Sequence, residues 1–172
     1  HWIFDAVRQF GRGHVRMVAE AAVEHMCDGV IGFGIGGDES RGPATAFVDI
    51  FTWTKSQGLA SLPHAGETTD ANALWAALEL HPDRIGHGIA AAQDPALMRH
   101  LRDHNIPIEV CITSNLCTGA VPSLDAHPVR KLFDAGVPIT LNTDDPAMFK
   151  TSLEREFQLA AEQYGFSKAE LQ

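Results

Sequence analysis

The residues best suited to chemistry are histidines and carboxylates that follow short apolar runs. His64 opens the stretch His-Ala-Gly-Glu directly after such a run, and Glu67 follows three positions later. An imidazole nitrogen can bind a divalent metal such as zinc, and a neighbouring carboxyl group can give or take a proton. Taken alone, His64 could equally be a structural histidine with an ordinary hydrogen bond.

Two further motifs offer the same kinds of group. His87 stands between glycines in Arg-Ile-Gly-His-Gly, which indicates little room around its ring, although a glycine-rich turn with an incidental histidine has the same pattern. Asp144 and Asp145 follow another apolar run and precede Pro146. Two adjacent carboxylates are costly to bury unless a cation or a donor compensates them. Alternatively, Asp145 could simply cap a helix that starts at Pro146.

The elements that must position these groups follow a regular order of apolar run, turn and helical stretch. Apolar runs separated by helices indicate a parallel α/β sheet with right-handed crossovers. We expect strands within Gly29–Phe33, Leu59–His64, Arg84–His87, Ile106–Cys111 and Val137–Asn142. We expect helices over about His14–His25, Thr45–Gln57, Asp70–Glu79, Asp94–Asp103, His127–Asp134 and Leu153–Tyr164.

The positions of the polar groups decide between an open doubly wound sheet and a barrel. They follow several successive strands instead of gathering at one switch point, which is typical of a TIM (β/α)8 barrel. A whole barrel needs about 250 residues, so 172 residues can form only part of one. We therefore expect a single domain over 1–172 with roughly strands 4–8 and their helices. We expect the segment that starts at His1 to be helical. The two open sheet edges require a preceding N-terminal barrel segment for closure.

Composition limits the classes of function. The chain has 172 residues and a net charge of −9, without the clustered Lys and Arg that a nucleic-acid partner requires. It has no apolar run of the length that a membrane span needs. Three cysteines without metal-type spacing fit free thiols in a reducing compartment, so we expect a cytoplasmic location.

The ordered motifs HAGE, RIGHG and LNTDDP together resemble those of the adenosine deaminase family, in the amidohydrolase superfamily of metal-dependent hydrolases. A glycine-rich loop that ends in Gly-Asp-Glu at Glu39 is similar to the family's loop, and Thr113-Ser114-Asn115 is similar to a stretch of its bacterial members. The resemblance runs from about Val30 to Phe166. It implies that the chain is the C-terminal portion of such an enzyme.

The resemblance also implies a set of catalytic roles. His64 and Asp144 would be ligands of a Zn²⁺ ion, which lowers the pKa of bound water to around 7. Glu67 would donate a proton to N1 of a purine ring, and His87 would hold the attacking hydroxide. The implied reaction is hydrolytic deamination of an aminopurine nucleoside, with adenosine giving inosine and ammonia.

Two further residues would bind this small-molecule purine nucleoside. Asp145 would contact the N7 side of the ring, and the backbone amide of Gly37 would bind N3. Gly34 departs from the aspartate that many adenosine deaminases have there, which removes a carboxylate near the metal ligands. Adenine and aminodeoxyfutalosine therefore stay open as alternative substrates.

The family's histidine pair on the first barrel strand has no counterpart here, because no His-x-His sequence occurs in the chain. Only His64 and Asp144 are then available as zinc ligands, whereas zinc sites generally need three or more. By itself the chain should hold zinc weakly and catalyse poorly. A non-catalytic module derived from a truncated barrel is the alternative from a different class.

Overall fold

Six strands form one parallel sheet in the computed structural model, which describes residues 1–172. Each strand pairs with the one before it in the sequence, in the order β1-β2-β3-β4-β5-β6. The strands are β1 (Trp2–Val7), β2 (Val30–Gly36), β3 (Ala60–Ala65), β4 (Ile85–His87), β5 (Ile108–Val110) and β6 (Ile139–Leu141).

Eight α-helices accompany the sheet, and those between strands make the crossovers that parallel pairing requires. They are α1 (Arg12–Glu24), α2 (Val48–Ser56), α3 (Ala71–Ala77), α4 (Pro95–Asp103), α5 (Ile112–Cys117), α6 (Val129–Asp134), α7 (Pro146–Phe149) and α8 (Leu153–Tyr164). Short 3-10 turns occur at Arg8–Phe10, Met26–Asp28, Glu39–Arg41, Ala44–Phe47, Leu78–Leu80, Ile89–Gln93 and Leu124–Ala126.

The five predicted strands and six predicted helices are confirmed, with shifted ends. Asp70 and Asp94 cap α3 and α4 as expected, since each side chain accepts a backbone N–H of the first turn. Helix α5 had not been predicted, and α7 had been raised only as the helix that Asp145 would cap. They lie in the loops after β5 and β6 and have six and four residues, too short to show a helical hydrophobic period.

The helix-like interpretation of the N-terminus is wrong, because Trp2–Val7 forms strand β1. His1 directly precedes this strand, so the sheet has six strands and not the five expected. The aromatic and branched residues of the segment favour a strand. Its outer residues are exposed, Trp2 at 68% and Ile3 at 42%. The sequence therefore lacks the alternation of apolar and polar residues by which a half-buried strand is recognised.

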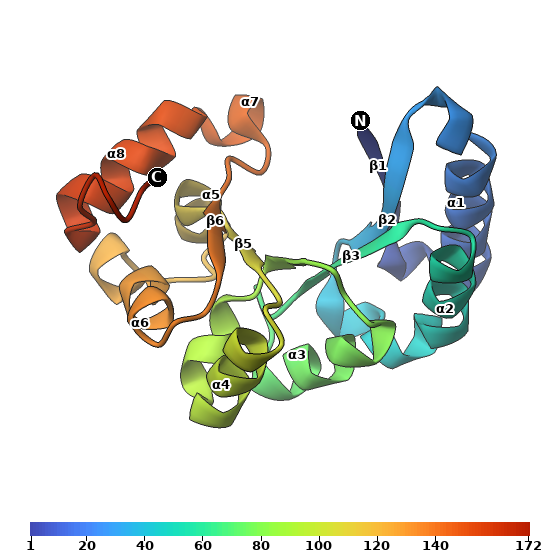
Figure 1. Ribbon diagram of the computed structural model, residues 1–172, viewed down its shortest axis with the longest axis horizontal. Coiled ribbons are helices and arrows are strands. Elements are labelled where there is room, and N and C mark those ends of the chain that lie inside the picture. Colours follow the sequence, from blue (N-terminus) through green and yellow to red (C-terminus); the bar gives the residue numbers. More distant parts are fainter.

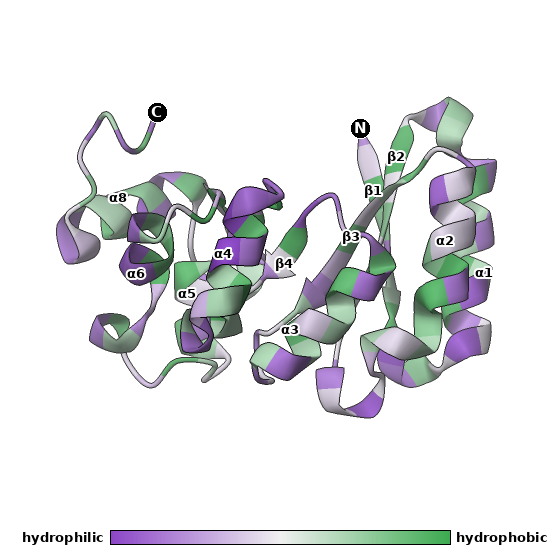
Figure 2. Cartoon of the chain, turned by 60° about the horizontal axis from the view of Figure 1, so that its bottom comes forward, coloured by the Kyte–Doolittle hydropathy of each residue, from purple (hydrophilic) through white to green (hydrophobic).

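The sheet is curved, and its helices line the outer side of the curve (Figure 1). Strands β1 and β6 are the two edges and face each other across the open side. Figure 2 shows that most helices carry both hydrophilic and hydrophobic residues, as expected for helices with one face on a core. None of the helices combines the length and the hydropathy that crossing a lipid bilayer would require.

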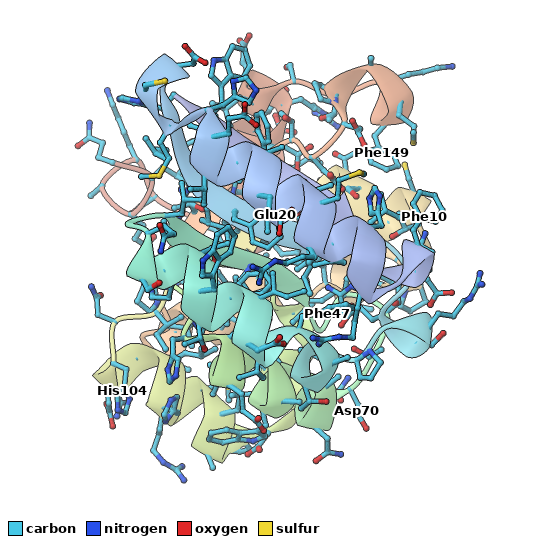
Figure 3. The ribbon with its side chains drawn as sticks, turned by 90° about the vertical axis from the view of Figure 1, so that its right-hand side faces the viewer. Phe10, Glu20, Phe47, Asp70, His104 and Phe149 are labelled. Carbon is cyan, nitrogen blue, oxygen red and sulfur yellow. The ribbon has the colours of Figure 1, made fainter.

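The hydrophobic core lies between the sheet and these outer helices. Phe33 of β2 and Phe51 of α2 are fully buried, and their rings pack with centroids 5.0 Å apart and planes tilted by 45°. Figure 3 looks onto the α1 and α2 side, where Phe47 lies at the start of α2 and Glu20 lies on α1. The other large, fully buried side chains are Phe47, Ile35, Ile50, Leu74, Leu80, Ile85, Leu97, Leu101, Ile108 and Ile112.

Replacing Phe51 by alanine should lower the free energy of unfolding of the full-length protein by about 3–5 kcal/mol, because it removes a buried ring and leaves a cavity. The matched control is Met17→Ala, since Met17 is 59% exposed on α1 and should change stability by less than about 0.5 kcal/mol. Denaturant unfolding followed by circular dichroism measures both. Equal losses in the two variants would contradict this location of the core.

Candidate active site

The predicted chemical groups meet at the carboxyl end of the sheet. His64 lies in β3 and Glu67 in the turn that follows it, His87 ends β4, and Asp144 follows β6. Parallel pairing sets His64 opposite Gly86 and Ala65 opposite His87. Neighbouring parallel strands end at the same edge, so these side chains, far apart in the sequence, are brought to one rim.

His87 is at the centre of the cluster. Its Nε2 atom lies 3.5 Å from Oε2 of Glu67 and 3.8 Å from Oδ2 of Asp144. Its ring centroid is 5.3 Å from that of His64. A cavity of about 130 Å³ is lined by His64, Gly86, His87, Glu109, Cys111, Asn142 and Asp144. The predicted convergence of the two histidines and the two carboxylates is therefore found in the structure.

The glycines beside His87 let other side chains approach the backbone closely, although the ring next to Gly86 is that of His64 and not that of His87. A Cβ atom on Gly86 would lie 2.8 Å from ring atoms of His64, so the imidazole can lie against β4 only over a glycine. Gly88 has φ +67°, and a Cβ there would lie 2.5 Å from Ile108 of the next strand.

The backbone is strained at two of the predicted site residues. His87 has φ +60° and Asp144 has φ +55°, a left-handed conformation that residues with a Cβ seldom adopt. Such conformations persist when the surrounding structure holds them, and they concentrate at functional sites.

Burial and neighbouring charges set the electrostatics of the rim. The side chain of His87 is 3% exposed, and desolvation lowers the pKa of its imidazole despite the opposing effect of the Glu67 carboxylate. Asp144 accepts a hydrogen bond from the Ser114 hydroxyl at 2.6 Å, and Glu67 accepts one from the Thr118 hydroxyl at 3.0 Å. Both carboxylates are thus oriented by hydroxyl donors.

Glu39 supports the site, although the sequence offered it only as the last letter of a loop motif. Its buried carboxylate accepts the backbone N–H groups of Gly66, Glu67 and Thr68 and the hydroxyl of Thr69, at 2.7–3.2 Å. Desolvation raises the pKa of Glu39, but these hydrogen bonds outweigh it, and the pKa lies below its usual 4.5. One carboxylate therefore fixes the turn that carries Glu67.

Arg8 was not predicted as a site residue, because the N-terminal segment that contains it was expected to be helical. Its guanidinium is 2% exposed and donates to the backbone carbonyls of Ile35, Gly36, Gly42 and His64. It thereby ties the ends of β2 and β3 together. Recognising Trp2–Val7 as a strand would have placed Arg8 at a strand end and made it a candidate.

Asp5 of β1 changes the interpretation of Gly34. A Cβ on Gly34 would lie 2.5 Å from Oδ1 of Asp5 and 2.6 Å from the carbonyl oxygen of Leu62. The place that a carboxylate on residue 34 would take is thus occupied by a carboxylate from the neighbouring strand. Oδ2 of Asp5 lies 3.7 Å from Nδ1 of His64. The expectation that Gly34 leaves this region without a carboxylate is wrong.

The two residues expected to bind the substrate lie outside the histidine cluster. Gly37 follows β2 with φ +88°, and a Cβ there would overlap the Gln9 side chain. Asp145 is exposed and directly precedes α7, but its side chain makes no capping hydrogen bond, so the capping alternative is not supported. A polar cavity of about 560 Å³ is lined by Gly37, Asp38, Ser40, Glu67, Thr68, Thr69 and Thr118.

His64 and Asp144 are the types of side chain that bind zinc, but two ligands are too few for a zinc site. His64 offers an imidazole and Asp144 a carboxylate, both usual zinc ligands. Nδ1 of His64 is buried without a hydrogen-bond partner. No group of three or more His, Cys, Asp or Glu side chains is close enough to hold a metal ion. Residues 1–172 therefore offer two side chains of kinds that zinc binds, but no complete ligand set.

Comparisons with known proteins agree with this geometry. The family model described as adenosine deaminase matches residues 2–172. The chain is 44% identical over 163 residues to aminodeoxyfutalosine deaminase of Streptomyces avermitilis, covering 93% of this chain and 46% of the relative. It is 41% identical over 170 residues to adenine deaminase of Rhizobium leguminosarum bv. trifolii, covering 98% and 53%. The chain spans about half the length of these curated relatives.

A solved structure shows the same fold. An amidohydrolase from Burkholderia ambifaria with bound Zn superposes with a TM-score of 0.89 at 26% identity, covering 97% of this chain and 47% of that one. The six-stranded parallel sheet is thus part of a (β/α)8 barrel, as the positions of the polar groups predicted.

Replacing Glu39 by glutamine should disorder the turn before α3, because an amide cannot accept all four hydrogen bonds. We expect a loss of about 2 kcal/mol or more in unfolding free energy and a lower kcat for any reaction that uses Glu67. The pKa of Glu39 is lowered on folding, so its stabilisation is present above about pH 4.5 and is lost as the pH falls through the lowered pKa.

Unfolding free energies of the full-length protein and of Glu39→Gln, measured between pH 3 and pH 7, check this. The difference between the two proteins should shrink toward acid pH. Glu79→Gln is the matched control, since Glu79 is exposed. A difference that stays constant across the range would exclude the ionised carboxylate as the cause.

Proposed function

Because the chain belongs to the adenosine deaminase family, we propose that the protein of which it forms part is a zinc-dependent hydrolytic deaminase of aminopurines. The observation that carries the proposal is the meeting of His64, Glu67, His87 and Asp144 at the carboxyl ends of three strands. In (β/α)8 enzymes this end of the barrel holds the active site.

The proposed reaction replaces the exocyclic amino group of a purine by oxygen. Water adds its oxygen to C6, the bond between C6 and the amino nitrogen breaks, and ammonia leaves. Of the two protons of water, one ends on N1 and one on the departing ammonia. A residue must therefore give and take protons beside C6, and another must hold the attacking water.

In this proposal Glu67 transfers protons to and from the purine ring and the amino group. Its carboxyl group lines the polar cavity that also reaches Gly37, so a purine bound there would present a ring nitrogen to it. The Thr118 hydroxyl donates to Oε1, and the Glu39 network fixes the backbone of the turn. A carboxyl group held in this way can protonate N1, take the two protons of the attacking water in turn, and pass one of them to the leaving nitrogen, so that it ends protonated as it began.

In this proposal His87 holds and orients the attacking water. Its Nε2 atom faces the gap between Glu67 and Asp144, and the ring is almost fully buried. A hydrogen bond from this position can orient the water oxygen toward C6 and stabilise the negative charge that develops as it adds.

His64 and Asp144 are assigned to the metal. Zinc, when bound, supplies a Lewis acid that makes water nucleophilic at neutral pH. The Ser114 hydroxyl orients Asp144, and Gly86 provides the space in which the His64 ring lies. Since zinc needs further ligands, we propose that they come from residues outside the 172 described here.

The substrate is proposed to be adenosine, with adenine and aminodeoxyfutalosine as the alternatives. Gly37 would bind N3 through its amide, and Asp145 would contact the N7 side of the ring. The polar cavity of about 560 Å³ lies within the range of small-molecule sites. Three free cysteines, Cys27, Cys111 and Cys117, support a location in the reducing cytoplasm.

Replacing Glu67 by glutamine in the full-length protein should lower kcat by about 10²-fold or more, while zinc stays bound. Loss of adenine-type absorbance, measured with each of the three candidate substrates, reports the activity, and elemental analysis reports the zinc. Glu79→Gln is again the matched control. Full activity in the Glu67 variant would remove this residue from the mechanism. A full-length protein without activity or zinc would favour the non-catalytic module.

Substitutions at the two adjacent aspartates, Asp144 and Asp145, should have different effects on zinc binding and catalysis. Asp144→Asn should lower zinc affinity by at least about 10-fold, since a ligand is lost. Asp145→Asn should keep zinc and raise KM, because it alters contact with the ring. Chelator competition and steady-state kinetics on the full-length protein measure these effects. Zinc loss from Asp145→Asn alone would reverse the two assignments.

A further inference from the structure

A line of three buried polar side chains runs away from the rim behind His87. Nδ1 of His87 lies 3.0 Å from Nδ2 of Asn115, and Oδ1 of Asn115 lies 3.2 Å from Nε2 of His127. The three residues are 2%, 0% and 5% exposed. Asn115 belongs to α5 and His127 to the turn before α6. The function proposed above gives no role to Asn115 or His127.

The far end of this line has a fixed polarity. The backbone N–H of Val129 donates to Nδ1 of His127 at 3.1 Å, and a backbone N–H can only donate. Nδ1 of His127 is therefore an acceptor and carries no proton. Burial lowers the pKa of His127 to about 4, so the ring is neutral at pH 7 and its single proton is on Nε2.

That proton sets the orientation of Asn115. The Nε2–H group of His127 donates to the asparagine, so the atom facing it must be the carbonyl oxygen. The amide nitrogen then faces His87 and donates to Nδ1. An amide flip would place two donors against each other at the His127 end, so it is excluded.

We propose that Asn115 and His127 are positioning residues that hold His87 as the tautomer protonated on Nε2 alone. Nδ1 of His87 accepts from Asn115, so the ring proton is on Nε2, which faces Glu67 and Asp144. The fixed end of the relay is a main-chain N–H, whose polarity no side-chain rotation can change. The inference about the tautomer stands on geometry, and its catalytic consequence rests on the proposed function.

This tautomer decides what His87 can do. A ring with Nε2–H donates a hydrogen bond to the oxygen of the attacking water and to the charge that develops on it. The opposite tautomer would offer an Nε2 lone pair as a base, but its Nδ1–H would oppose the Asn115 amide N–H at 3.0 Å. His87 is therefore a donor to the nucleophile, and the protons of the water pass to Glu67 once that residue has protonated N1.

Asn115→Asp is the sharpest test, because it changes one nitrogen to oxygen. A carboxylate only accepts, so His87 would carry its proton on Nδ1, while the bond from His127 would remain. In the zinc-loaded full-length protein labelled with ¹⁵N-histidine, nuclear magnetic resonance identifies the protonated ring nitrogen. The His87 signals are assigned by their loss in His87→Gln.

The expected result is an Nε2–H ring in the native protein and an Nδ1–H ring in Asn115→Asp. With substrate, kcat should fall by about 10²-fold or more, while KM changes little. Asn105→Asp is the matched control, since Asn105 is exposed in the turn after α4. A native ring protonated on Nδ1, or an unchanged tautomer in Asn115→Asp, would overturn the proposal.

A second pair of variants tests the anchor without a buried charge. His127→Gln keeps an N–H donor near the position of Nε2 and should preserve the His87 tautomer. His127→Leu removes the donor, frees the amide of Asn115 to flip, and should give a mixture of both tautomers. A single Nε2–H tautomer in the leucine variant would overturn the role of His127. The tautomer is read without turnover, so a protein inactive on all aminopurines contradicts the proposed function and leaves this inference standing.

Discussion

Parallel pairing in sequence order is the constraint on which the rest of this structure depends. Because each strand lies beside its predecessor and points the same way, the segments that follow the strands emerge at one rim. His64, His87 and Asp144 are separated by tens of residues and meet only for this reason. Crossover helices on the outer side keep the strands parallel and bury one face of the sheet.

Close approach of the strands then fixes the side chains at the rim. Gly86 lets the His64 ring lie against β4, and Gly34 lets β2 approach β3 while the Asp5 carboxylate fills the space beside it. His87 and Asp144 adopt left-handed backbone conformations. Conformations of this kind are maintained by the contacts around them, so the site is a property of the whole sheet.

Buried polar networks supply the remaining order. Glu39 gathers three backbone N–H groups and one hydroxyl beneath the Glu67 turn, and Arg8 joins the ends of two strands through their carbonyls. On the other side, the line from Val129 through His127 and Asn115 reaches His87. Each network satisfies groups that would be costly to bury alone. The first two fix the backbone at Glu67 and His64, and the third contacts the His87 ring.

The sequence alone determined the alternation of strands and helices and the positions of His64, Glu67, His87 and Asp144 at or just after the strand ends. These depend on local signals: apolar runs, capping aspartates such as Asp94, and residues that directly follow a strand. It missed β1, and with it Asp5 and Arg8, because an uncovered edge strand has no alternating burial. Only the tertiary structure decided which groups touch, since the partners of Glu39 and His87 lie on other elements and no local pattern encodes a contact between them.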